Sequence, residues 1–547
     1  MGEDQEDIVD ERRKDTPKEI EMRNLEEDFR EARRFVVDLL KRNNVGKTMI
    51  SETLLIFEAL CYKIFEQREH DDAVVRISGS DSFGEAKIKM IFEGGMYSQL
   101  LHFEDGPNPE DSILRAYRDK VDYSYQLGHN KIVISARRSH HRTMIIYAAA
   151  LILSLVAYVL IISAAGPAGG KTLNDNLIFP LNDFYTNVML MIGAPVTFLS
   201  LLKNLTDVYV ISEANSNARQ IQKLTYYTSV IAVLLAIPTA MLTSRISAEF
   251  TNPLSYYKGV SINLPVGEFI RSLMPDNLFE PFMTVSPFPM LIMAILTTYA
   301  FCSSGKYFDK LKEAIDVCYT LFTRILNIVM QFLPVFAFTA LLDIMISNGI
   351  SVILHLGALV AGILLSMVVL NAFYIVRLVV NNVRILPFLR LLRPIMTENS
   401  EIPNGIEAIP FNIRSCARTF GLDRKKLETS MPVLAEINLD GNCFILTLIS
   451  VTFLLMSGTN YTLLDALIIG ALVFFLSLGA PNQPGSCLIG MLIILNYLNV
   501  PDLMPVAILC EVFFGGLLNL VNVTGDIVTV VCEEKDNLKD ELRRKRS

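Results

Sequence analysis

The chain has 547 residues, of which 51% are hydrophobic and 19% are charged, and its formal net charge is −8. A mean hydropathy of +0.39 excludes an ordinary soluble protein, and no nucleic-acid partner is expected. The eight cysteines form no CxxC pair, so neither a disulfide framework nor a transition-metal site is predicted.

The first 142 residues carry much of the charge and are predicted to form a separate cytosolic α+β domain. Helical spacing of apolar residues predicts two helices, and alternation of apolar and polar residues predicts at least three strands. The helices are expected over 15–42 and 52–66, and the strands over 74–78, 88–92 and 131–136.

The segment 143–532 is predicted to be the membrane domain, followed by a charged cytosolic tail over 533–547. Eight of its apolar stretches are read as transmembrane helices, several being uncharged and long enough to cross ~30 Å of hydrocarbon. They are 144–165, 184–202, 225–243, 282–302, 325–342, 348–376, 431–456 and 503–530.

Basic residues indicate the orientation. They cluster at 137–142, just before the first span, and again at 543–546, whereas the loop between the fifth and sixth spans has no Lys or Arg. The positive-inside bias therefore predicts a multi-pass protein of the cell (inner) membrane with both termini in the cytoplasm.

Two further stretches are too interrupted for simple spans. Pro481-Asn482-Gln483-Pro484-Gly485 breaks the uncharged run 466–500, and Asn404-Gly405 breaks 385–428. Each half is the length of a re-entrant segment. Two re-entrant hairpins are predicted, each followed by a helix with a polar break, which amounts to an inverted repeat.

Those polar breaks are the most informative positions. Asn438-Leu439-Asp440-Gly441-Asn442 and Asn522-Val523-Thr524-Gly525-Asp526 lie inside apolar sequence. Carboxylates at membrane depth are costly unless they face a cavity, a partner or an ion. Two broken helices, each with an Asp, therefore indicate a cation site of an ion-coupled secondary transporter. The alternative is a pair of helix caps at loop ends.

Both motifs resemble the dicarboxylate/amino-acid:cation symporter family, which has the glutamate-transporter fold. The first motif reads Asn-Met-Asp-Gly in the family, and the second is identical. Three further segments resemble family helices in the same order: Met189–Ser200, Leu273–Phe279 and Met330–Phe338. The resemblance covers about 144–532. It implies a homotrimer in lipid whose protomers each move a transport domain past a scaffold, as an elevator.

The resemblance also implies the cation ligands. One family sodium site corresponds to Asn522 and Asp526 with backbone carbonyls, and another to Asn438 and Asp440 with Thr228 and Ser229. Sodium or a proton is the expected coupling ion, with no organic cofactor. The alternative is that these residues only stabilise helix breaks.

The solute site departs from the family pattern. The family Asp that binds a substrate amino group corresponds to Gly515, and the Arg that binds a side-chain carboxylate corresponds to Leu518; Glu511 falls where the family also has an acid. A desolvated carboxylate would lack a cation there, so an acidic amino acid or a C4-dicarboxylate is not expected. A neutral or cationic small organic solute is predicted, with candidate ligands Asn404, Glu407, Glu436, Asn482, Gln483, Asn519 and Thr524.

Two alternatives apply to the unusual acids. Glu436 is a candidate for proton exchange, or Glu407 and Glu436 form structural ion pairs with Arg414 or Arg418.

The N-terminal domain resembles the histidine-kinase-like ATPase domain of anti-sigma factors, around 54–60 and 119–134. The motifs that bind nucleotide and magnesium in that family are changed here: Tyr62 replaces the magnesium-binding Asn, and Glu93-Gly94-Gly95 replaces the Asp-x-Gly box. A degenerate regulatory domain that binds a cytosolic protein is therefore predicted, rather than an ATPase.

The whole sequence predicts a cation-coupled symporter with a regulatory domain, and not an enzyme. The first alternative is a non-transporting solute receptor, a transceptor, that signals through the N-terminal domain. An ATP-driven sensor kinase is disfavoured, because the nucleotide site is incomplete and no phosphoacceptor helix is evident.

Overall fold

The chain forms two compact units, Met1–Thr143 and Met144–Ser547, in the computed structural model. The structure describes residues 19–23, 25–43, 45–66, 74–82, 85–93, 114, 121–126, 129–137, 140–214, 216–250, 273–275, 277–400, 402, 405–456, 462–481, 483–498 and 503–533.

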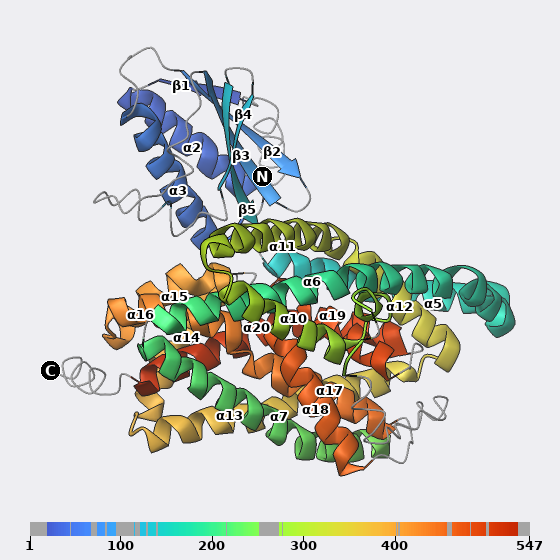
Figure 1. Ribbon diagram of the computed structural model, residues 1–547. Coiled ribbons are helices and arrows are strands. Elements are labelled where there is room, and N and C mark those ends of the chain that lie inside the picture. The colour runs from blue at the N-terminus through green and yellow to red at the C-terminus, as the bar shows by residue number, and fades with distance from the viewer. Residues whose placement is uncertain are drawn as a thin grey trace. The chain divides into compact units, whose positions relative to one another are not determined.

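The first unit is a five-stranded antiparallel sheet with two helices on one face (Figure 1). The strand order is β1-β2-β3-β5-β4. The strands are β1 (Glu19–Met22), β2 (Val75–Ser82), β3 (Glu85–Glu93), β4 (Val121–Gln126) and β5 (His129–Arg137). The predicted strands correspond to β2, β3 and β5, and the prediction missed β1 and β4.

The helices are α2 (Glu26–Arg42) and α3 (Lys47–Glu66). Ala32, Val36 and Leu40 recur every four residues along α2 and are fully buried against the sheet. The predicted helix over 15–42 was wrong at its start. Residues Glu19–Met22 are a strand, because alternate burial places Met22 in the core opposite Val75.

The second unit is helical. Its helices are α5 (His140–Leu173), η3 (Asn174–Ile178), α6 (Phe179–Ala214), α7 (Ser216–Phe250), α9 (Glu280–Met283), α10 (Pro287–Cys302), η5 (Gly305–Tyr307), α11 (Phe308–Met330), α12 (Leu333–Asn348), α13 (Val352–Val380), α14 (Ile385–Asn399), α15 (Gly405–Phe420), α16 (Arg424–Ile437), α17 (Asp440–Met456), α18 (Leu463–Leu478), α19 (Ser486–Tyr497) and α20 (Met504–Glu533).

All eight predicted spans overlap helices of this unit. Within the described residues, five helices are long and apolar enough to cross a membrane, and six if α10 with η5 and α11, bent by 109°, count as one. One of the five is a run of 68 residues, Thr143–Val210. A crossing takes about 20 residues, so this run contains both of the first two predicted spans, separated by the non-helical Gly166.

Two predicted boundaries were wrong. The span 325–342 is divided between α11 and α12, with Pro334 in the first turn of α12. The predicted break of the last helix does not occur, since α20 is helical throughout Met504–Glu533. Its polar residues are satisfied in two ways. Thr524 donates to the carbonyl of Leu520 within α20, whereas Asn522 and Asp526 bond to residues at the α16–α17 junction.

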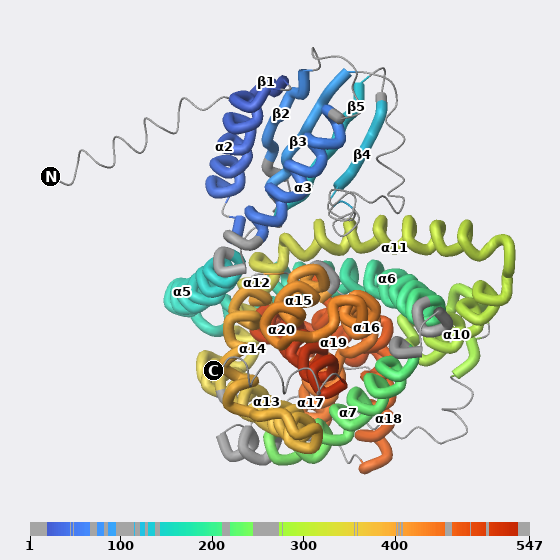
Figure 2. Tube along the Cα trace, turned by 90° about the vertical axis from the view of Figure 1, so that its left-hand side faces the viewer, coloured from blue at the N-terminus to red at the C-terminus, as the bar shows by residue number. Residues whose placement is uncertain are grey.

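The predicted hairpins correspond to two pairs of adjacent helices, α14 with α15 and α18 with α19. In the second tip Gly485 has φ of 96°, a left-handed conformation that favours glycine. Figure 2 shows α20 in the interior of this unit, where it packs against α12, α16, α17 and α19. The two hairpins and the α16–α17 junction therefore meet around one central helix.

Candidate cation and solute site

The site is centred on the junction between α16 and α17, where Asn438 and Leu439 are not helical. The freed backbone is satisfied from α20, because the N–H of Gly441 donates to Asn522 Oδ1 at 2.9 Å. A Cβ at position 441 would lie 2.8 Å from Asn522 Oδ1 and 3.0 Å from Val521. Glycine is therefore required for the close approach of α17 to α20.

Asp440 is fully buried at the first turn of α17. Its Oδ1 accepts hydrogen bonds from Ser229 Oγ at 2.8 Å and from Thr228 Oγ1 at 3.2 Å, both on α7. Its Oδ2 has no hydrogen-bond partner among the described residues. A buried carboxylate with one unpartnered oxygen is costly unless a cation or a proton compensates it.

The second carboxylate of the site belongs to α20. Asp526 accepts a hydrogen bond from Asn438 Nδ2 at 2.7 Å, and Asn522 Nδ2 donates to Asn442 Oδ1 at 3.2 Å. The amide oxygen of Asn438 is buried and, within the described chain, also lacks a partner. The site thus holds two carboxylates and at least two unpartnered oxygens.

The structure brings the six predicted cation residues together from α7, the α16–α17 junction and α20. We call them the six-residue cluster: Thr228, Ser229, Asn438, Asp440, Asn522 and Asp526. Each is at most 9% exposed. Buried hydroxyl, amide and carboxylate oxygens are the ligands that hard cations prefer, so the donor set fits sodium.

Arg377 on α13 was not among the predicted site residues. Its Nη2 donates to Thr529 on α20 at 3.1 Å, and its charge lies close enough to Asp440 to interact. Its Nη1 is buried without a hydrogen-bond partner among the described residues. The signal in the sequence was a single arginine near the end of the apolar stretch that forms α13.

The predicted solute residues lie partly along α20. Asn519 Nδ2 donates to the carbonyl of Ile402 at 3.3 Å, and a Cβ at Gly405 would lie 3.7 Å from Asn519 Oδ1. Thr524 Oγ1 contacts Met396 Sδ at 3.3 Å. The first hairpin therefore places its tip against α20. Asn404 and Asn482 lie outside the described residues, as does the Glu407 side chain, and Gln483 is half-buried in the second tip.

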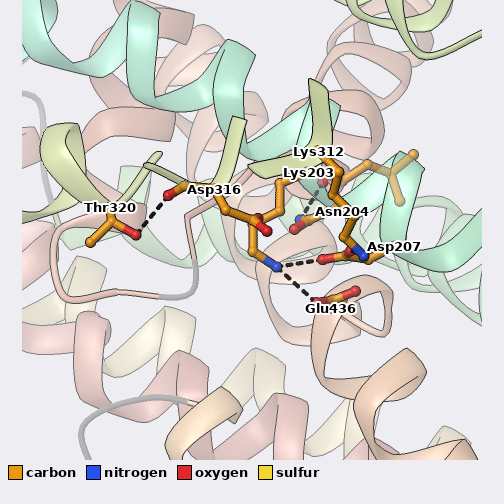
Figure 3. A network of polar contacts seen from close by, with 8 residues as sticks. Lys203, Asn204, Asp207, Lys312, Asp316, Thr320 and Glu436 are labelled. Atoms are coloured by element: carbon orange, nitrogen blue, oxygen red, sulfur yellow. Dashed lines mark hydrogen bonds and ion pairs between the residues drawn. The ribbon is translucent and has the colours of Figure 1, made fainter. Parts of the chain in front are cut away.

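Glu436 belongs to a network of ion pairs rather than to the group of predicted solute residues along α20 (Figure 3). Its Oε1 lies 3.3 Å from Lys203 Nζ on α6, and Lys203 also pairs with Asp207. Lys312 on α11 pairs with Asp207 from the other side. The alternative of a pair with Arg414 or Arg418 was wrong for Glu436, because the packing of α16 against α6 brings Lys203 to it.

The second hairpin is fastened to two helices. On α6, Ser200 Oγ donates to the carbonyl of Ala480 at 3.3 Å, and Asn204 Nδ2 to that of Leu478 at 3.1 Å. On α20, Glu511 accepts from the N–H groups of Gly485 and Leu488, each at 2.9 Å.

The Glu511 carboxylate therefore caps the start of α19, where free N–H groups and the helix dipole favour negative charge. Sequence reasoning noted this acid without giving it a role. A Cβ at Gly515 would lie 2.5 Å from Glu511 Oε1, so an acidic side chain at position 515 would need Glu511 to move.

Long apolar helices, paired short helices and buried carboxylates at a helix junction define a polytopic membrane transporter. A profile of the sodium:dicarboxylate symporter family matches residues 155–535, and the chain belongs to that family. The match leaves the first unit outside it.

Curated relatives agree with this assignment. A C4-dicarboxylate transport protein of Deinococcus radiodurans is 22% identical over 410 residues, which cover 72% of this chain and 90% of the relative. One of Caulobacter vibrioides is 24% identical over 423 residues, covering 71% and 95%. One of Xylella fastidiosa is 23% identical over 395 residues, covering 68% and 84%.

Proposed function

We propose that the protein is a symporter that couples uptake of a small organic solute to sodium or protons, with the six-residue cluster as the coupling site. The observation that carries the proposal is that, within the described residues, neither Oδ2 of the buried Asp440 nor the amide oxygen of the buried Asn438 has a hydrogen-bond partner. A bound cation supplies the charge that the carboxylates lack. Ser229 and Thr228 orient Asp440, and Asn438 orients Asp526.

For the solute, the chain's own residues favour a molecule without an acidic side chain. Gly515 and Leu518 supply no charge on α20, and Leu518 is 2% exposed. Asn519, Thr524 and Gln483 are the polar ligands we assign within the described residues, with Asn404, Asn482 and Glu407 completing the set. Glu436 forms an ion pair with Lys203, so we do not assign it a direct contact with the solute; its proposed role is to hold the end of α16 through that pair.

A C4-dicarboxylate is the second candidate solute, since the relatives are named as C4-dicarboxylate transport proteins. The two candidates differ in whether a doubly charged anion binds. Thermal stability of the purified protein with sodium present, measured against succinate, aspartate and neutral amino acids, separates them, because a ligand that binds the folded state raises its stability.

We further propose that the second hairpin tip is the gate and that the protein works as a homotrimeric elevator with cytoplasmic termini in the inner membrane. Four hydrogen bonds tie the tip to α6 and α20, so opening requires these to break together.

The first unit is proposed to be regulatory. Tyr62 is exposed on α3, and Glu58 is paired with Arg33 at 2.8 Å. Binding of Mg-ATP to the full chain at micromolar concentration would contradict this.

The test of the coupling site is thermal unfolding in sodium, potassium and choline chloride at constant ionic strength, repeated for Asp440→Asn and Asp526→Asn. We expect sodium alone to stabilise the protein and either substitution to remove that effect. The control is Asp309→Asn, an exposed carboxylate at the start of α11. If no cation discriminates and acidification does not substitute for sodium, the receptor without transport becomes the better reading.

A further inference from the structure

A further buried carboxylate, outside the six-residue cluster, lies on α12. Asp343 is 5% exposed and is surrounded by polar side chains from the π-helical segment η3, from α6 and from α12 itself. We call this group the Asp343 cluster: Asn174, Asn182, Thr339, Asp343 and Ser347.

The Asp343 charge is poorly compensated. Asn174 Nδ2 donates to Oδ1 at 2.7 Å, but the bonds from Ser347 to Oδ1 and from Asn182 to Oδ2 are both 3.4 Å long. No Lys or Arg forms an ion pair with Asp343 in the described part of the chain. Three neutral donors, two of them distant, do not offset the loss of water around a carboxylate.

A second observation points to a ligand. Asn174 is 3% exposed, and its amide oxygen has no hydrogen-bond partner within the described residues. Rotating this amide by 180° exchanges its oxygen and nitrogen. In that rotated form the oxygen would face the Asp343 carboxylate in place of the Nδ2 donor, and the two oxygens would repel each other unless a cation lay between them.

The supporting oxygens extend the site. Thr339 Oγ1 donates to Asn182 Oδ1 at 2.6 Å, leaving that amide oxygen with a further lone pair. Asn174 opens a π-helix, a rare structure that often marks functional positions. Ser347 is exposed, so the cluster lies near the surface of its unit.

We propose that the Asp343 cluster binds a monovalent alkali cation, at a site separate from the six-residue cluster. One carboxylate supplies a single negative charge, and the amide and hydroxyl oxygens complete a set of hard ligands. The cation joins η3 to α12, across 169 residues of sequence.

The experiment compares the full-length wild-type protein in detergent with three variants: Asp343→Asn, Asp440→Asn and the double substitution. Unfolding is followed with a thiol-reactive dye, because the chain has eight cysteines and no tryptophan. Sodium, potassium and lithium chloride are titrated against choline chloride at constant ionic strength.

We expect Asp343→Asn to be at least as stable as wild type in choline, because a buried uncompensated charge has been removed. Its unfolding temperature should rise less in alkali chloride than that of wild type, by about 2 °C or more at saturation. Asp440→Asn should keep this response, and the double substitution should lose it, so failure of the coupling site and failure of this site are distinguishable.

The control substitution is Asp183→Asn, a neighbouring exposed carboxylate on α6, which should leave the alkali response unchanged. A hydrogen-bonding role alone predicts the opposite pattern: Asp343→Asn less stable in choline, with the full alkali response. That result overturns the proposal. The proposal is also overturned if the Asp440→Asn variant, with Asp343 intact, shows no rise in unfolding temperature in any alkali chloride. It is likewise overturned if lowering the pH raises the unfolding temperature of Asp440→Asn whereas alkali chlorides do not.

Discussion

Lys203 Nζ lies 3.3 Å from Glu436 Oε1 and joins α6 to the end of α16, two residues before Asn438. The two side chains are 22% and 11% exposed, and Asp207 and Lys312 make the network neutral. The ion pair therefore fixes the helix end that carries the cation residues, and it is held in turn by a second pair from α11.

Replacing Lys203 by Met should destabilise the protein by roughly 2 kcal/mol, between the values for exposed and fully buried pairs. It leaves two acids in a partly desolvated place without their shared cation. Adding Glu436→Gln should restore part of the loss, since one unpaired charge is then removed. Thermal unfolding of both variants measures this. A double variant less stable than Lys203→Met would contradict the coupling of the pair.

Ser229→Ala removes the shorter of the two hydroxyl bonds to Asp440, at 2.8 Å. Because bonds to charged groups contribute about 1.5–3 kcal/mol, the half-maximal sodium concentration should rise by about tenfold or more. Thr228→Val removes a bond of 3.2 Å and should have the smaller effect. The measurement is a sodium titration of thermal stability, with the exposed Ser163→Ala as the control. Equal responses in all three variants would exclude a hydroxyl role at Asp440.

Gly441→Ala should cost about 1–3 kcal/mol, because its Cβ would overlap Asn522 Oδ1 and Val521 in the packed contact between α17 and α20. It should also weaken the sodium response, since Asn522 must move. Gly357→Ala is the matched control. No atom lies within 4 Å of a Cβ there, and the residue is inside α13, so alanine should be neutral or stabilising. If both variants behave alike, close approach does not explain Gly441.

Glu511→Ala removes both carboxylate bonds to the start of α19 and should loosen the second hairpin tip. Cys487 lies between Gly485 and Leu488 and is fully buried, so its modification by a thiol reagent reports opening of the tip. We expect the rate to rise about tenfold or more, from the loss of charge-assisted bonds.

The background for that measurement is Cys318→Ser, because Cys318 is exposed. Burial raises the pKa of the Cys61 thiol in the first unit, so that residue reacts slowly. A parallel Cys487→Ala variant identifies the signal. An unchanged rate in Glu511→Ala would mean that the carboxylate does not hold the tip.

The membrane class, the hairpins, Asp440 and Asp526 each leave a local mark in the sequence: an apolar run, a Pro-Gly or Asn-Gly interruption, or an Asp within apolar sequence. Thr228 and Ser229 leave none, and only the resemblance to the symporter family implied them. The predicted break in α20 was wrong. The motif Asn522–Asp526 has the composition of a break, but its polar groups are satisfied by Gly441 and Asn438 from α17 and the helix junction, so the helix continues.

The sequence by itself determined the family, the helical membrane fold and the positions of Asp440 and Asp526, since these follow from hydrophobic pattern and short motifs along contiguous residues. Only the tertiary structure decided that Asp343, expected in the loop after the fifth predicted span, is buried within α12, and which partners the buried acids meet. Glu436 meets Lys203 across 233 residues, Asp343 meets Asn174 across 169 and Glu511 meets Gly485 across 26. Such pairs depend on how the helices pack, and no local pattern encodes which distant donor reaches a given carboxylate.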